Sequence, residues 1–124
     1  LELSTRDPKS IRFYVHSLSN RFDAERLVKK HPKCSVFQWS NDLKFLRHVR
    51  GGKVNNPSSA DFFLVPFLSK CYFNFEAKYF LDRMESDFNT LVEELEATEA
   101  WKKWPERHIF IFSSGVGPTL VPSW

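Results

Sequence analysis

The sequence has few cysteines and no long hydrophobic run. Its two cysteines among 124 residues, Cys34 and Cys71, do not form a C-x-x-C pair, so they cannot make a zinc site by themselves. The longest apolar run, from Phe62 to Leu68, has seven residues, whereas an α-helix needs roughly 20 to cross a bilayer. We therefore expect no metal centre, no cofactor and no membrane span in this segment.

Signatures of hydrolytic catalysis and of nucleic-acid binding are also missing. The serines form no G-x-S-x-G elbow, and the glutamates of residues 93–99 are typical of a solvated helix surface. The net charge of +3 hides a basic first half, since residues 1–58 carry 12 Lys and Arg against 5 Asp and Glu. These residues fall mostly in helical patterns, which favours an ordinary solvated face. Without a known signature beside the charge, we expect no nucleic-acid partner.

The sequence does contain enough apolar and aromatic residues for a core. Its apolar content is 42%, and 13 residues are phenylalanine, which suits a β-sheet interior. A chain of this length forms one compact domain, and we assign residues 1–124 to it.

Four segments predict β-strands. The central one is Phe62 to Pro66, five apolar residues in a row, as in a strand buried on both faces of a sheet. Pro66 lacks the amide that an interior strand needs, so it marks the carboxyl end of this strand. Ile11 to His16, Cys34 to Gln38 and Ile109 to Phe112 are the other three predicted strands.

Helical patterns separate these strands. One begins with a cap at Asn20 and stops before Pro32, a second runs from Ser40 to Arg50, and a long one runs from Asn74 to Trp104 with a bend near Asn89. Alternating strands and helices predict an α/β fold, a Rossmann-like parallel sheet with helices on both faces and right-handed crossovers.

Ligands of open α/β sheets bind at the carboxyl ends of the strands, so the loops at that edge hold the candidate site. His16 follows the first strand, where it can hold a hydroxyl group or act as a base. The paired glycines of Ser113 to Gly117 allow a close approach by an anion or a sugar hydroxyl. The candidate substrate-binding residues are His16, Ser17, Ser69, Lys70, Ser114, Gly115 and Gly117. The catalytic residue stays unassigned.

Structural explanations compete with several of these assignments. A histidine such as His16 more often has a structural hydrogen-bond partner, and the glycines can simply form a tight turn. His108 starts the last predicted strand, at the edge opposite the candidate site, so we expect a structural role for it.

Two segments resemble a known family. Asn56 to Phe67, Asn-Pro-Ser-Ser-Ala-Asp-Phe-Phe-Leu-Val-Pro-Phe, is similar to the D-P-x-x-A-D-x-F-F-V-P-F segment of exostosin-type glycosyltransferases, the glycosyltransferase family 47. Trp104, followed by Arg107 to Gly117, resembles that family's W-x-x-x-G-R-D-H-x-x-V segment and the glycine-containing loop after it. The two matches occur in the family's order, and Phe112 to Trp124 most resembles its plant cell-wall branch.

The resemblance implies one half of a GT-B glycosyltransferase, the N-terminal, acceptor-side domain. A nucleotide-sugar donor would bind mainly to a second Rossmann-like domain, which this chain lacks, and a glycan would be the acceptor. Family members work in the Golgi lumen, so the resemblance also implies a type II membrane anchor upstream of this segment. In that compartment Cys34 and Cys71 can pair as a disulfide, although two separate buried thiols remain equally compatible with the sequence.

Two other functions fit the same residues. A non-catalytic Rossmann-like module that binds a glycan or a partner protein needs only one such domain. A small flavodoxin-like domain would use Ser113 to Gly117 to hold a phosphate group.

Overall fold

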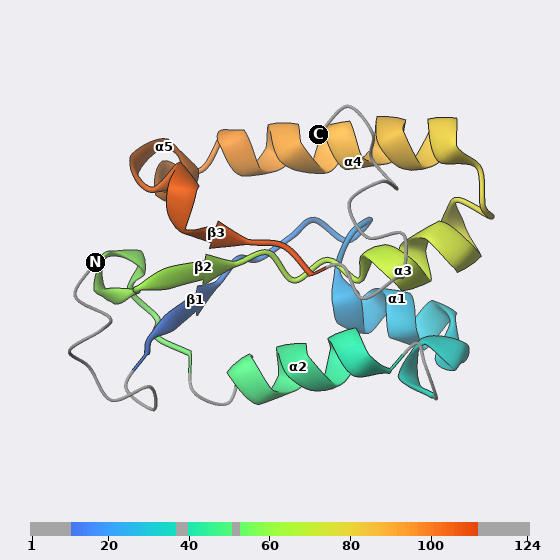
Figure 1. The fold of residues 1–124 in the computed structure, drawn as a ribbon, viewed down its shortest axis with the longest axis horizontal. Coiled ribbons are helices and arrows are strands. Elements are labelled where there is room, and N and C mark those ends of the chain that lie inside the picture. The colour runs from blue at the N-terminus through green and yellow to red at the C-terminus, as the bar shows by residue number, and fades with distance from the viewer. Residues whose placement is uncertain (1–10, 37–39, 51–52, 112–124) are drawn as a thin grey trace.

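The computed structural model describes residues 11–36, 40–50 and 53–111, which form an α/β fold around a three-stranded parallel sheet (Figure 1). The predicted glycine loop, Ser113 to Gly117, lies outside the described residues. The elements in chain order are β1 (Phe13–Val15), α1 (Ala24–Lys30), η3 (Pro32–Ser35), α2 (Asn41–Arg50), η5 (Pro57–Ser59), β2 (Phe62–Leu64), α3 (Ser69–Cys71), η6 (Tyr72–Glu76), α4 (Leu81–Glu96), α5 (Glu99–Lys103), η7 (Pro105–Arg107) and β3 (His108–Ile109).

The predicted central strand is the middle strand of the sheet. The order is β1-β2-β3, and both pairings are parallel, with Phe63 of β2 beside Tyr14 on one side and His108 on the other. Phe63 and Leu64 are fully buried, because each has a strand on both sides and packed side chains on its own face. Parallel strands buried in this way account for the uninterrupted apolar run in the sequence.

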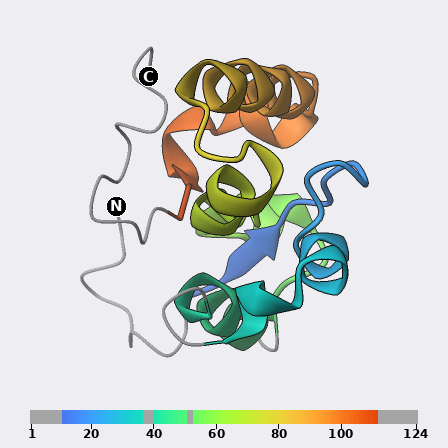
Figure 2. The same ribbon diagram turned by 90° about the vertical axis from the view of Figure 1, so that its right-hand side faces the viewer.

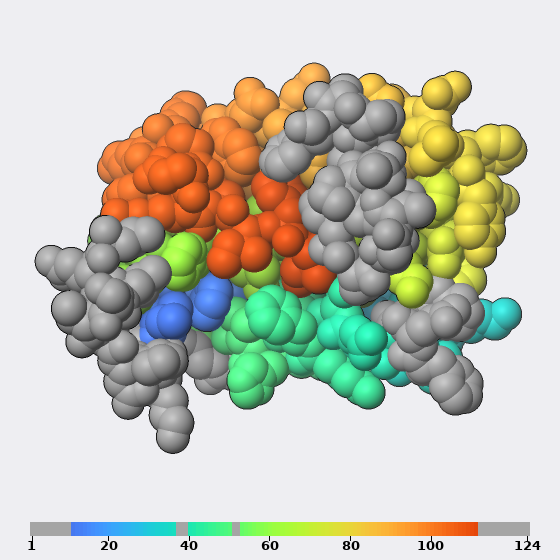
Figure 3. All heavy atoms as spheres, viewed as in Figure 1, coloured from blue at the N-terminus to red at the C-terminus, as the bar shows by residue number. Residues whose placement is uncertain are grey.

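Helices lie on two sides of the sheet. Helix α4 lies beyond β3, whereas α1 and α2 lie beyond β1, an arrangement that both ribbon views show (Figures 1 and 2). Figure 2 looks toward the carboxyl ends of the strands, with α1 and α3 at that end of the molecule. In the space-filling view, α2 and the segment from α5 to β3 are exposed on one face (Figure 3).

The main core joins the sheet to three helices. Val15 and Leu64 of the strands belong to one cluster with buried residues of α1, α2 and α4. These residues are Ala24, Leu27, Leu43, Leu46, Val49, Met84, Phe88, Leu91 and Leu95. Phe63 belongs to a second, smaller cluster with Ala60 and Ala100, against which Tyr14 and Trp104 pack. Ala100 of α5 and Trp104 after it therefore pack beside Phe63, whereas Trp101 of α5 packs against the main core.

One predicted strand is wrong. Cys34 and Ser35 belong to the 3-10 helix η3, and residues 37–39 lie outside the described part of the chain. Pro32 opens this turn, because its fixed φ favours the first position of a helix. Cys34 is fully buried and forms a disulfide with Cys71, with a Cα–Cα distance of 5.8 Å. The disulfide holds η3 against α3. Because this segment is not a strand, the described sheet has three strands and not four.

The long predicted helix is divided. Asn74 lies in a π-helical turn, η6, rather than at a helix N-cap, and α4 begins only at Leu81. Helix α4 continues through Asn89, where we expected a bend, and ends at Glu96; the Thr98 side chain then caps the separate helix α5. In α1 the cap is Asp23, which accepts a hydrogen bond from the Arg26 amide, and not Asn20. The predicted second helix is confirmed as α2.

Within the described residues, no helix combines the length and the apolar character needed to span a membrane.

Candidate functional site

The end of β1 opens into a pocket that contains two of the predicted site residues. The amide of His16 donates to the Leu64 carbonyl at 3.1 Å, which extends the β1–β2 pairing by one residue before the chain turns away. The pocket has a volume of about 290 Å³. We call it the His16 pocket; its lining residues are Val15, His16, Ser17, Leu18, Asp23, Arg50 and Lys53. It is therefore a polar pocket at the carboxyl end of a parallel strand, where ligands of such sheets bind.

His16 lies in direct contact with His108. The two Nε2 atoms are 2.8 Å apart, and the ring centroids are 4.9 Å apart. Phe63 lies against both rings and stacks on His108 with centroids 5.0 Å apart. The expectation that His108 lies away from the His16 site is therefore wrong. The strands are only two or three residues long, so an imidazole at the start of β3 reaches one at the end of β1.

The hydrogen bonds fix which nitrogens carry protons when both rings are neutral. Nδ1 of His108 lies 2.8 Å from the Trp104 carbonyl, which can only accept, so Nδ1 is the donor. Nε2 of His108 then has a lone pair, and His16 Nε2–H donates to it. His16 is left with a lone pair on Nδ1. It can therefore accept a hydrogen bond from a hydroxyl group.

Both histidines favour the neutral state. Burial, together with the nearby His108, lowers the pKa of His16 to about 4. Burial also lowers the pKa of His108, although the Trp104 carbonyl acts in the opposite direction. Near neutral pH the pair is uncharged, so it is suited to hydrogen bonding and not to binding an anion.

The other predicted site residues do not join the His16 pocket. Ser69 is buried, and its hydroxyl donates to the Ile111 carbonyl at 2.7 Å, which ties α3 to the chain after β3. Lys70 is half-buried on α3 and is absent from the His16 pocket lining. Ser114, Gly115 and Gly117 lie outside the described residues.

Sequence reasoning missed three contributors to this region: His108, Arg50 and Lys53. The sequence indicated Arg50 and Lys53 only through the excess of Lys and Arg in residues 1–58. That excess does not predict which of these residues line a pocket. Nothing in the sequence signalled the contact between the two histidines, which are 92 positions apart.

In residues 11–36, 40–50 and 53–111, no three His, Cys, Asp or Glu side chains gather as a set of metal ligands. Comparisons of the chain with models of known protein families, with curated proteins and with solved structures found no match.

Proposed function

We propose that this chain is the N-terminal, acceptor-side domain of an exostosin-type glycosyltransferase. In this proposal a second Rossmann-like domain binds the nucleotide-sugar donor, and the two domains face each other across a cleft in the GT-B arrangement. The chain alone binds acceptor glycan and does not transfer sugar. The complete enzyme works in the Golgi lumen, with a membrane anchor upstream of this segment.

One observation carries the proposal. The family-like segment Asn56 to Phe67 contains β2, the middle strand of a parallel sheet, and the pocket with His16 opens at the end of the neighbouring strand. The second family-like segment includes β3, the other neighbour of β2, and supplies His108. Both resembling segments are thus adjacent in space.

The disulfide supports the proposed compartment. Disulfides form and persist in oxidising environments such as the secretory pathway and are rare in the cytosol. The pairing of Cys34 with Cys71 is compatible with a protein that folds in the lumen of that pathway.

The proposed role of His16 is to orient the acceptor. A glycan is rich in hydroxyl groups, and the neutral imidazole offers them the lone pair on Nδ1. Arg50 and Lys53, which also line the pocket, supply donors for glycan oxygens. The role in transfer is positional, because a correctly held hydroxyl reacts faster with a donor bound opposite.

A binding and transfer experiment tests this function. The chain is titrated with neutral and acidic plant cell-wall oligosaccharides while amide shifts are followed by NMR, and transfer is assayed with nucleotide sugars. We expect shifts at residues 16–18 and no transfer by this chain alone. The matched variants are His16→Gln, which should weaken glycan binding, and His48→Gln on the exposed side of α2, which should not.

Two results would overturn the proposal. Sugar transfer by the isolated chain would show that no second domain is needed. Glycan binding by a longer natural polypeptide that has no second Rossmann-like domain would favour the non-catalytic glycan-binding module instead.

A further inference from the structure

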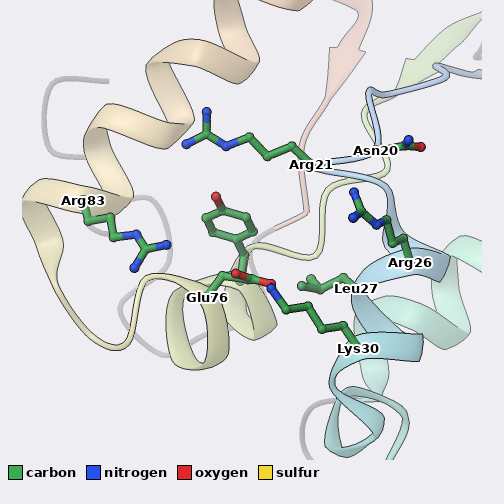
Figure 4. Close-up of a pocket in the computed structure, with 8 residues that line it drawn as sticks. Asn20, Arg21, Arg26, Leu27, Lys30, Glu76 and Arg83 are labelled. Carbon is green, nitrogen blue, oxygen red and sulfur yellow. The ribbon is translucent and has the colours of Figure 1, made fainter.

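A second pocket at the same edge of the sheet is rich in arginine. It lies between the loop after β1, helix α1, the turn η6 and the start of α4, and its volume is about 220 Å³. Figure 4 shows Arg83 extending from α4 toward the space faced by Arg26 and Lys30 of α1. We call it the basic pocket, and the residues that matter here are Arg21, Arg26, Lys30, Tyr72, Glu76 and Arg83.

Two carboxylates organise most of this positive charge. Asp87, nearly buried, forms an ion pair with Arg21, lies 3.8 Å from Arg83 and accepts a hydrogen bond from the Tyr72 hydroxyl at 2.8 Å. Burial, and then this hydrogen bond, raise the pKa of Tyr72 to about 12, so the hydroxyl remains a donor. These contacts hold Arg21 and Arg83 at the wall of the pocket.

Glu76 holds the third cation. Its carboxylate lies 2.8 Å from Lys30 Nζ and 3.1 Å from His31 Nε2. Burial alone would raise the pKa of Glu76, but these two partners keep it below the usual value. Lys30 is therefore paired with a carboxylate that stays ionised.

Arg26 is different. Among the described residues its guanidinium forms no ion pair, while its backbone amide is bound by Asp23. Four cations thus face two carboxylates, which leaves a surplus of two positive charges around one concave space. Guanidinium groups offer paired donors that match a carboxylate or a phosphate group.

We propose that the basic pocket binds an oxyanion, a carboxylate or a phosphate group, of a ligand held at the carboxyl edge of the sheet. Arg26 makes the primary contact, with Lys30 beside it on α1 and Arg83 on the facing helix α4. Two ligands would supply the group: an acidic sugar of the acceptor, or the phosphates of a nucleotide sugar. Naming these two sources rests on the proposed function, whereas the oxyanion site does not.

Isothermal titration of the disulfide-bonded 124-residue chain tests the site with four probes. These are inorganic phosphate, uridine diphosphate, trigalacturonate and the neutral trisaccharide maltotriose. At least one anionic probe should bind at least about tenfold more tightly than maltotriose, and its affinity should fall with added salt. Binding of trigalacturonate alone identifies the acceptor as the source, and binding of phosphate and uridine diphosphate identifies the nucleotide.

Matched substitutions on α1 show where the probe binds. Arg26→Ala should weaken the anionic probe about tenfold, as expected for loss of a charge-assisted contact. Lys29→Ala removes another exposed cation of α1 that does not line the pocket, and should leave affinity unchanged. Arg26→Gln, checked by circular dichroism, provides a second variant if the alanine variant is poorly folded.

The proposal is overturned if the anionic probes bind no better than maltotriose, or if the double variant Arg26→Ala/Arg83→Ala binds them like the unaltered chain. Its outcome is separable from that of the proposed function. If uridine diphosphate binds at Arg26 and no glycan binds, the oxyanion site is supported and the proposed acceptor-binding role is contradicted.

Discussion

The His16 pocket and the basic pocket share the loop that follows β1 but are stabilised in different ways. His16 packs among the rings of Tyr14, Phe63 and His108 and is neutral, with a hydrogen bond to His108. Arg21 and Arg26, a few residues later, are exposed at the wall of the basic pocket, where an ion pair with Asp87 holds Arg21. The segment from His16 to Arg26 thus offers a neutral hydrogen-bond acceptor at one end and cations at the other. In the proposed function, the two pockets would bind the hydroxyl and the charged groups of one sugar-containing ligand.

This difference in how the two pockets are stabilised predicts how each responds to substitutions and to acid. A site built on packed rings depends on the core beneath it, so core substitutions and acid should damage it. A site built on surface arginines should lose binding while the fold persists, because exposed side chains contribute little to stability.

The largest effect should come from Phe63→Ala. Phe63 is fully buried and stacks on both Trp104 and His108, so its loss leaves a cavity below the histidine pair. We expect the free energy of unfolding to fall by about 3 to 5 kcal/mol in urea titrations. Phe45→Ala, at a side chain that is 44% exposed, is the control and should cost much less. A loss below about 1 kcal/mol for Phe63→Ala would contradict the buried position of β2.

Acid should destabilise the fold through His16. Its pKa is about 4 in the folded chain against 6.5 for the free side chain, so the unfolded state binds more protons between these values. The stabilisation is complete above pH 6.5 and is lost as the pH falls toward 4, by about 3 kcal/mol. Urea unfolding at several pH values measures this. His16→Gln should flatten the dependence and His48→Gln should not; equal slopes in all three proteins would refute the assignment.

A smaller loss of stability is expected from the contact between Tyr72 and Asp87, beside the basic pocket. Tyr72→Phe removes the hydroxyl that donates to Asp87 but leaves the ion pairs with Arg21 and Arg83. We expect a loss of about 2 kcal/mol in the free energy of unfolding, as for other hydrogen bonds to charged groups. Tyr79→Phe removes a hydroxyl from a side chain that is 65% exposed, so it serves as the neutral control. Equal stabilities of the two variants would mean that the Tyr72–Asp87 contact does not contribute.

The smallest change in stability should come from Arg26→Ala. Its side chain is exposed and, within the described ranges, forms no ion pair, so unfolding should shift by less than about 0.5 kcal/mol. Thermal unfolding followed by circular dichroism measures this shift. A larger loss would show that Arg26 supports the fold, and that the contrast between the two pockets is wrong.

The strands of the sheet were predictable where burial imposed a simple pattern. Phe62 to Leu64 has a strand on each side, so almost every position had to be apolar, and the run is visible without any structure. The parallel direction followed from the helices between strands. Cys34 was mistaken for a strand residue because a short apolar segment has no period, and its burial comes instead from the disulfide.

The candidate site was less predictable. His16 and Ser17 were found because residues after a parallel strand share an edge of the sheet. The His16–His108 contact was missed because it depends on side chains reaching across Phe63, which strand order does not specify. The basic pocket was missed because its cations come from three separate segments, and helical spacing alone suggested a solvated face.

The chain reverses direction between η6 and α4 through two consecutive residues with positive φ, Lys78 at 52° and Tyr79 at 67°. Non-glycine residues pay a steric cost in this conformation, and Phe80, which precedes α4, has no side-chain oxygen to cap the helix. The turn at Lys78 and Tyr79 therefore determines where α4 starts and how far Arg83 lies from Arg26. The width of the gap between the two guanidinium groups depends on a pair of backbone dihedral angles that lie outside the pocket itself.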